Sequence, residues 1–172
     1  MPIRRKLWLL LLVVLLLAFS PRLPGAALAP PYDRYANAVL GQPDFNSSLF
    51  NNGGLTAQSL YHPAGLAIDP GSGRLYVADF NNNRVLSWPS AAGFTNHAAA
   101  DIVFGQGGEF TTAIANKGGI SADSLKWPAG LALDGQHSLY VSDSGNNRIL
   151  RFNTPEEGDT KADMVFGQGG VF

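Results

Sequence analysis

The sequence predicts an all-β protein made of two tandem copies of one four-stranded antiparallel unit. The 172 residues include 20 glycines and 11 prolines but only 15% charged residues, a composition typical of short strands joined by tight turns. Long segments of the chain repeat at a nearly constant offset. No segment has the length and the 3.6-residue period of a substantial helix.

The repeat consists of three blocks. Residues 51–69, NNGGLTAQSLYHPAGLAID, align with residues 116–134, NKGGISADSLKWPAGLALD. Residues 74–88, RLYVADFNNNRVLSW, align with residues 138–152, SLYVSDSGNNRILRF. A short block occurs three times, as VLGQ at Val39 and as VFGQ at Val103 and Val165. Self-similarity of this density indicates a repeat architecture.

Each unit contains four runs with the apolar, β-branched and aromatic content of strands. The connections between the first three runs are short and rich in Gly, Asn or Pro, as hairpins require. The predicted strands are Ala64–Asp69 and its equivalent in the second unit, Leu75–Asp79 and Leu139–Asp143, Arg84–Trp88 and Arg148–Phe152, and Asp101–Gly105 and Asp163–Gly167.

Two further segments are predicted to form one short helical turn each. They are Thr56–Leu60 and Ser121–Leu125, with Thr56 and Ser121 placed as N-caps. Nothing else in the sequence favours a helix.

The N-terminus has the pattern of a targeting segment. The basic residues Arg4, Arg5 and Lys6 precede an uninterrupted apolar stretch over residues 7–19, followed by small residues near Ala27. We expect a signal peptide over residues 1–27, a linker over 28–35 and a folded body over 36–172. An uncleaved membrane anchor is the alternative, although the apolar stretch is shorter than the ~20 residues that span a bilayer. In either case the body is predicted to be exported, and so secreted, periplasmic or at the cell surface.

The charge of the body argues against two classes of partner. Four of the 12 basic residues and none of the 13 acidic residues lie within residues 1–27, which leaves eight basic residues against 13 acidic ones, a net charge of −5. A mildly acidic body does not favour binding to nucleic acid or to anionic lipid. Because the chain has no cysteine, we expect neither disulfides nor a thiolate metal site.

A four-stranded antiparallel unit repeated in tandem is typical of a β-propeller blade. The segments PAGLAID…RLYVADFNNNRVLSW and PAGLALD…SLYVSDSGNNRILRF closely resemble the NHL repeat. The resemblance implies a partial β-propeller, with blade one at about residues 63–105 and blade two at about 128–168. Propellers of this family have about six blades, so the resemblance implies that these two blades are a fragment of a larger propeller with further blades in the same chain. The alternative is a ring closed by homo-oligomerisation.

Six charged residues recur at repeated positions. Antiparallel pairing brings Asp79 close to Arg84, and Asp143 close to Arg148, so we expect an ion pair within each blade. Asp69 and Asp134 are expected to accept hydrogen bonds from the turns that follow them. Because active sites are rarely repeated with the scaffold, these residues are predicted to be structural, and no metal or catalytic residue is assigned.

The long connections over residues 42–61 and 106–126 are the most informative feature for function. They emerge at the same end of the blades as the turns between the second and third strands, and such loops commonly carry binding sites. Their repeated apolar residues, Leu55, Leu60, Ile120 and Leu125, are expected to cover the blade junction. The residues that differ between the loops are the candidate binding residues: Phe45, Phe50, Tyr61, Phe110, Lys126 and Trp127.

The sequence therefore favours an exported, non-catalytic binding or scaffold domain with no cofactor, whose ligand is a protein, a peptide or a carbohydrate. The alternative is a part of a propeller enzyme of the lactone hydrolase or lyase type, with its catalytic residues in other blades. No nucleophile motif or phosphate-binding loop supports the second hypothesis. The histidines His62, His97 and His137 are scattered and are expected at surface or packing positions.

Overall fold

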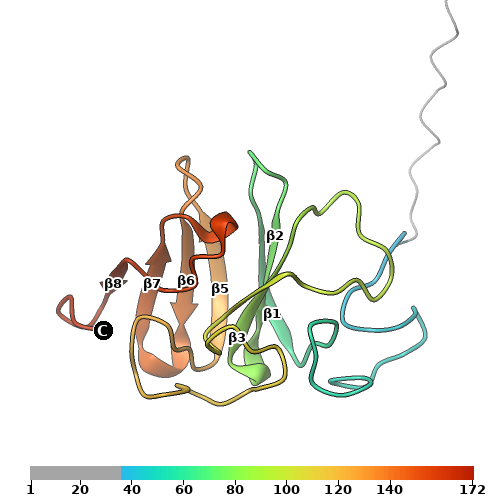
Figure 1. The fold of residues 1–172 in the computed structure, drawn as a ribbon, viewed down its shortest axis with the longest axis horizontal. Helices are drawn as coiled ribbons and strands as arrows, with labels where there is room; N and C mark the ends of the chain where they lie inside the picture. The colour runs from blue at the N-terminus through green and yellow to red at the C-terminus, as the bar shows by residue number, and fades with distance from the viewer. Residues whose placement is uncertain (1–35) are drawn as a thin grey trace, which may run out of the picture. The chain divides into compact units, whose positions relative to one another are not determined.

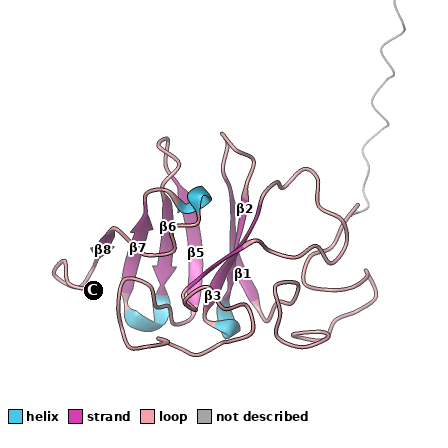
Figure 2. Ribbon diagram, in the orientation of Figure 1, coloured by secondary structure: helices cyan, strands magenta, loops and turns pink. Residues whose placement is uncertain are grey.

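The structure, a computed structural model, describes residues 36–172, and the predicted signal peptide and linker lie outside these residues. The body contains two four-stranded antiparallel sheets, in the orders β1-β2-β3-β4 and β5-β6-β7-β8 (Figures 1 and 2). Blade one is formed by β1 (Pro63–Ile68), β2 (Leu75–Asp79), β3 (Arg84–Trp88) and β4 (Ile102–Phe104). Blade two is formed by β5 (Pro128–Leu133), β6 (Leu139–Asp143), β7 (Arg148–Phe152) and β8 (Met164–Phe166). The predicted strands are confirmed to within one residue at each end.

The turn between the second and third strands of each blade contains a short 3-10 helix. These are η1 (Phe80–Asn82) and η2 (Ser144–Asn146), and a third, η3 (Pro155–Glu157), lies between β7 and β8. Asn83 and Asn147 end the first two turns in the left-handed conformation, with φ of 53° each. Asparagine tolerates this conformation better than most residues, so the repeated Asn has a local structural reason.

The predicted helical turns at Thr56–Leu60 and Ser121–Leu125 are wrong, because both segments form irregular turns. Thr56 does cap its segment, since its hydroxyl accepts a hydrogen bond from the Gln58 N–H at 3.2 Å. The Ser59 hydroxyl, however, accepts a hydrogen bond from the Thr56 N–H at 2.9 Å. This bond closes a turn through the Ser59 side chain, and no helix forms. This competition between side-chain hydroxyls and the helical backbone is typical of Ser and Thr.

The long connections and the η1 and η2 turns lie at the same end of the two blades, as predicted (the lower end in Figure 1). Gln106 holds the second connection in place. Its buried side-chain amide donates to the carbonyls of Asn83 and Ile114, at 2.8 and 3.0 Å, and accepts from the Ile114 N–H. The repeated Gln of the VFGQ block thus joins the connection to the turn of the preceding blade.

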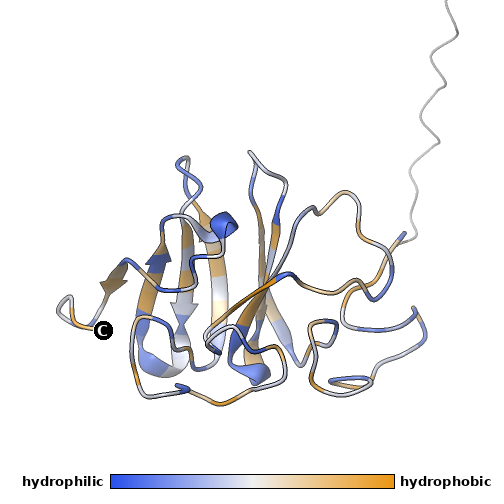
Figure 3. Cartoon of the chain, in the orientation of Figure 1, coloured by the Kyte–Doolittle hydropathy of each residue, from blue (hydrophilic) through white to orange (hydrophobic). Residues whose placement is uncertain are grey.

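The main hydrophobic core lies between the two blades. Blade one contributes Tyr76, Val85 and Phe104, and all three side chains are fully buried. Phe104 packs edge-on against Phe152 of blade two, with 5.1 Å between ring centroids. A second cluster covers the other side of blade one, and Figure 3 shows how apolar residues concentrate in the strands and polar ones in the turns. Of the predicted covering residues, Leu60 and Leu125 are buried and Leu55 is half-buried. Ile120 is 60% exposed, so it does not cover the junction as predicted.

The first strands of the two blades approach closely at Gly65. A Cβ atom added at Gly65 would lie 2.2 Å from the Ala129 carbonyl oxygen, whereas one at the equivalent Gly130 would meet nothing closer than the Ser142 Cβ at 3.6 Å. We expect Gly65→Ala to lower the free energy of unfolding by about 1–3 kcal/mol, because the backbone must shift. Gly130→Ala is the matched control and is expected to be nearly neutral in urea unfolding. Equal losses in the two variants would contradict this account of the junction.

Among the described residues, no helix is long and apolar enough to cross a membrane.

Candidate functional site

The Asp79–Arg84 ion pair lies at the loop end of blade one, the end that carries the long connections and the η1 turn. Arg84 Nε donates to Asp79 Oδ2 at 2.7 Å, and both side chains are fully buried. The Arg84 guanidinium also donates to the carbonyls of Thr56, Ser59 and Phe110, all in the connections. Burial raises the pKa of the Asp79 carboxyl, and the Arg84 charge opposes that rise. The pair therefore ties both long connections to the blade.

Asp79 also positions the residue that enters the first strand. Its Oδ1 accepts the Tyr61 N–H at 2.7 Å, and in blade two Asp143 Oδ1 accepts the Lys126 N–H at 2.7 Å. Asp143 pairs with Arg148 Nε at 2.7 Å, as in blade one. The repeated Asp thus holds the backbone at two of the predicted binding residues, Tyr61 and Lys126.

Asp69 and Asp134 accept hydrogen bonds from the turns that follow them. Asp69 Oδ1 accepts the Gly71 N–H at 2.7 Å, and Asp134 Oδ1 accepts the N–H groups of Gln136 and Ser138. Asp69 has one partner that the sequence did not predict, since its Oδ1 lies 2.7 Å from Nδ1 of His137 in blade two. His137 therefore links the blades rather than serving as a plain surface residue.

The stability of the body should fall in acid because of these carboxylates. Burial alone would raise the pKa of Asp69, but the hydrogen bonds from Gly71, His137 and Ser72 bring it below its ordinary value. The Ser138 and Gln136 N–H groups lower the pKa of Asp134 in the same way. A lowered folded-state pKa stabilises the fold above the unfolded pKa of about 3.9, and this stabilisation is lost as the pH falls below it.

We therefore expect the urea midpoint to be constant near neutral pH and to drop below about pH 4. Asp69→Asn should reduce this drop and lower the midpoint at pH 7. A midpoint that rises below pH 4, or an unchanged acid slope in the variant, would contradict the assignment.

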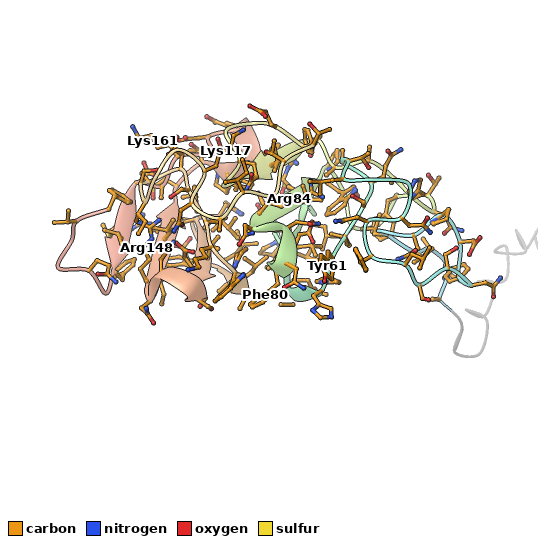
Figure 4. The ribbon with its side chains drawn as sticks, turned by 90° about the horizontal axis from the view of Figure 1, so that it is seen from below. Tyr61, Phe80, Arg84, Lys117, Arg148 and Lys161 are labelled. Carbon is orange, nitrogen blue, oxygen red and sulfur yellow. The ribbon has the colours of Figure 1, made fainter. Side chains whose placement is uncertain are left out.

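Aromatic side chains from both blades form a row at the loop end. Phe50 stacks on Tyr61 with 4.4 Å between ring centroids, and Tyr61 lies 5.4 Å from the His62 ring. His62 Nδ1 lies 3.0 Å from Asn81 Nδ2, which belongs to η1. Figure 4 shows Tyr61 and Phe80, the neighbour of Asn81, close together at this end.

The row continues into blade two. Phe80 stacks on Trp127 with 6.2 Å between centroids and an interplanar angle of 14°. The Lys126 ammonium lies 4.9 Å from the centre of the Trp127 ring. We define the aromatic row as Phe50, Tyr61, His62, Phe80, Trp127 and Lys126. Phe50 is 63% exposed and Trp127 47%, so both ends of the row face solvent.

The backbone at His62 and Trp127 is held in an unfavourable conformation. Both residues have left-handed φ values, 54° and 52°, and each precedes the proline that begins a strand. A left-handed non-glycine residue costs about 1–2 kcal/mol. The Asn83 side chain accepts the Trp127 N–H at 3.1 Å and helps to hold it there. The conformation recurs at the same position of both repeats and so belongs to the blade, whereas the side chains that occupy the position differ.

A groove of about 350 Å³ lies beside the blade-one end of the aromatic row. Phe50, Tyr61 and His62 are among the residues that line it, and Gln42 and Ser48 supply polar groups. Such a mixture of aromatic walls with few polar groups suits the binding of an apolar side chain.

The NHL repeat family model matches residues 60–86 and 125–152. The chain contains two NHL repeats. No curated protein gives a significant match to the chain. Together with the two four-stranded sheets, the NHL repeats suggest a propeller-type protein-interaction or scaffold domain.

The two NHL repeats contain most of the aromatic row. Of the predicted binding residues, the structure brings Phe50, Tyr61, Lys126 and Trp127 into the row. Phe45 is 53% exposed but lies outside it, and Phe110 is half-buried against the core cluster of blade one. Their roles in binding stay predictions. The Phe110 side chain packs against the core cluster, which gives it a structural role.

His62, Phe80 and Asn81 are not among the binding residues predicted from the sequence. A signal was present at Phe80, because blade two has Ser144 at the equivalent position of an otherwise repeated turn. His62 and Trp127 likewise occupy one repeated position with different side chains. Within residues 36–172, no group of three or more His, Asp or Glu side chains is placed to hold a metal ion.

Proposed function

We propose that the protein is an exported, non-catalytic binding domain that recognises a partner polypeptide through the aromatic row. The observation that supports it most directly is Trp127, a large aromatic side chain held exposed in a strained conformation between Phe80 and Lys126. Asparagine or glycine would occupy this backbone position at lower cost. An exposed tryptophan at a position where the backbone conformation disfavours it is best explained by a contact with another molecule.

The chemistry of the row favours a protein or peptide ligand. Trp, Tyr and Phe are enriched where proteins bind one another, and a few such residues supply most of the binding energy. The groove beside Phe50 and Tyr61 offers room for one apolar side chain of the ligand. A carbohydrate, which could also stack on Trp127, is the alternative ligand. Export is proposed on the N-terminal pattern of basic and apolar residues.

Selection from a displayed library of random peptides, run beside a glycan array, tests this function. We expect peptides that bind the chain and that lose affinity at least tenfold with Trp127→Asn and with Phe50→Ser, since removing a hot spot costs at least 2 kcal/mol. The control is Leu66→Ser, which shortens an equally exposed apolar side chain outside the row. Peptides that bind both row variants as tightly as the wild type would refute the proposal. Ligands found only on the glycan array would indicate that the partner is a carbohydrate and not a polypeptide.

A further inference from the structure

Two residues lie at the loop end of each blade, directly before its first strand. They are Tyr61 and His62 before β1, and Lys126 and Trp127 before β5. The backbone is fixed in the same way at both places, because a buried aspartate of each blade accepts the N–H of the first residue at 2.7 Å. The second residue has a left-handed φ in both blades. The backbone frame is therefore repeated, whereas the side chains that it presents are not.

The first of these two positions changes its chemistry between the blades. Tyr61 is an uncharged ring stacked on Phe50, whereas Lys126 carries an ammonium group. Because the aspartates bind only the backbone at this position, the frame accepts either side chain. A position with a fixed backbone and a variable side chain, on a loop held by a rigid sheet, is suited to select a ligand.

Gly145 of η2 makes room for the Lys126 side chain. A Cβ atom added at Gly145 would lie 2.5 Å from Cγ and 2.9 Å from Cδ of Lys126. The Gly145 N–H donates to the Lys126 carbonyl at 2.8 Å, as the Asn81 N–H donates to the Tyr61 carbonyl in blade one. The backbone contact thus recurs, but only blade two has a glycine there. The aliphatic part of the lysine therefore lies against the η2 turn.

The Lys126 ammonium is held over an aromatic ring and not against a carboxylate. It lies 4.9 Å from the centre of the Trp127 ring. The other cationic side chains at this end of the blades have acidic partners, since the two arginines pair with buried aspartates and Lys117 pairs with Glu109 at 2.7 Å. Within residues 36–172, Lys126 forms no salt bridge. Its charge is therefore available to a ligand that contacts Trp127.

We propose that Lys126 selects, in the partner polypeptide, a segment that carries an acidic residue beside an apolar one. The apolar side chain packs on Trp127, and the carboxylate pairs with the Lys126 ammonium. This inference rests on the proposed function, because it names the chemistry of the partner that the aromatic row binds.

The surroundings of the ammonium favour this pairing. A lysine already placed by the η2 turn and by the Trp127 ring loses less side-chain freedom when it binds a carboxylate. The body has an excess of acidic residues, so a strongly acidic partner would be repelled. The expected partner segment therefore carries a single acidic residue in otherwise neutral surroundings.

Selection of displayed random peptides on the wild type and on Lys126→Glu tests the inference. Peptides selected on the wild type should carry Asp or Glu next to an apolar residue, and those selected on the variant should carry Lys or Arg in its place. A wild-type-selected peptide should bind the variant about tenfold more weakly or worse at low salt, because attraction becomes repulsion. The difference should shrink at about 1 M salt, where charges are screened.

Two further variants serve as controls. Lys126→Arg keeps a cation that binds both a carboxylate and an aromatic ring, and it should bind within about twofold of the wild type. Lys161→Glu makes the same charge change at an exposed lysine between β7 and β8, at the end of the blade away from η2, and should bind as the wild type does. A reversed preference in Lys126→Glu also shows that this variant is folded.

Two results would overturn the inference and leave the proposed function intact. One is a peptide whose binding is lost in Trp127→Asn but unchanged in Lys126→Glu. The other is selection of the same acidic residue by the wild type and by Lys126→Glu. If no peptide binds the wild type, the proposed function and this inference are both wrong.

Discussion

Phe104→Ala is expected to lower the free energy of unfolding by about 3–5 kcal/mol, the range for removing a fully buried aromatic ring. Phe104 belongs to β4 but fills the space between the blades, where it contacts Tyr76 and Phe152. The cavity left by its removal is enclosed by rigid strands on both sides, so the structure cannot collapse to fill it. Urea unfolding followed by circular dichroism measures the loss.

The equivalent residue of blade two supplies the control. Phe166 occupies the same place in its sheet but is 41% exposed, so Phe166→Ala should cost about 1 kcal/mol or less in dilute solution. Similar losses in the two variants at low concentration would mean that the blades do not share one core.

Asp79→Ala is expected to cost about 3–5 kcal/mol, because it leaves the Arg84 charge buried without its partner. The change also removes the acceptor of the Tyr61 N–H and of the Asn82 side chain. We therefore expect it to disturb the aromatic row as well as the fold. Thermal and urea unfolding measure the first effect, and near-ultraviolet circular dichroism of the aromatic residues reports the second.

Two controls test whether the burial of the Asp79–Arg84 ion pair explains the expected loss of stability. Arg74 and Asp101 also form a bidentate pair, but the Asp101 side chain is 39% exposed, and Asp101→Ala should cost no more than about 1 kcal/mol. The double variant Asp79→Ala with Arg84→Met should lose less than the sum of the single variants. Strict additivity would show that the two charges do not stabilise each other.

The repeated features of this chain could be predicted from its sequence. Strand positions follow from the alternation of apolar residues and from Gly, Asn and Pro in the turns, and each repeat confirms the other. The Asp79–Arg84 pair follows from antiparallel register alone, because a residue that ends one strand lies beside the one that begins the next. Local rules are sufficient where both partners lie within one hairpin.

Features that depend on the packing of one blade on another could not be predicted in this way. The contact of Asp69 with His137 spans 68 residues, and no periodic pattern marks it. The stacking of Phe80 on Trp127 also joins two blades. Phe110 packs against the core cluster of blade one, and its carbonyl accepts a hydrogen bond from Arg84. The irregular turn at Thr56 arises because the Ser59 hydroxyl competes with the helical backbone for hydrogen bonds. Helix propensity alone does not show which of the two wins.

The central claim is that the two sheets share one core and unfold together. Amide hydrogen exchange of the wild type and of Phe104→Ala tests it most directly, with β6 and β7 of blade two as the reporters. We expect the loss of protection in β6 and β7 to equal the loss in β2 and β3, because the variant weakens a core common to both sheets. Protection in blade two that is unchanged by Phe104→Ala would contradict the claim.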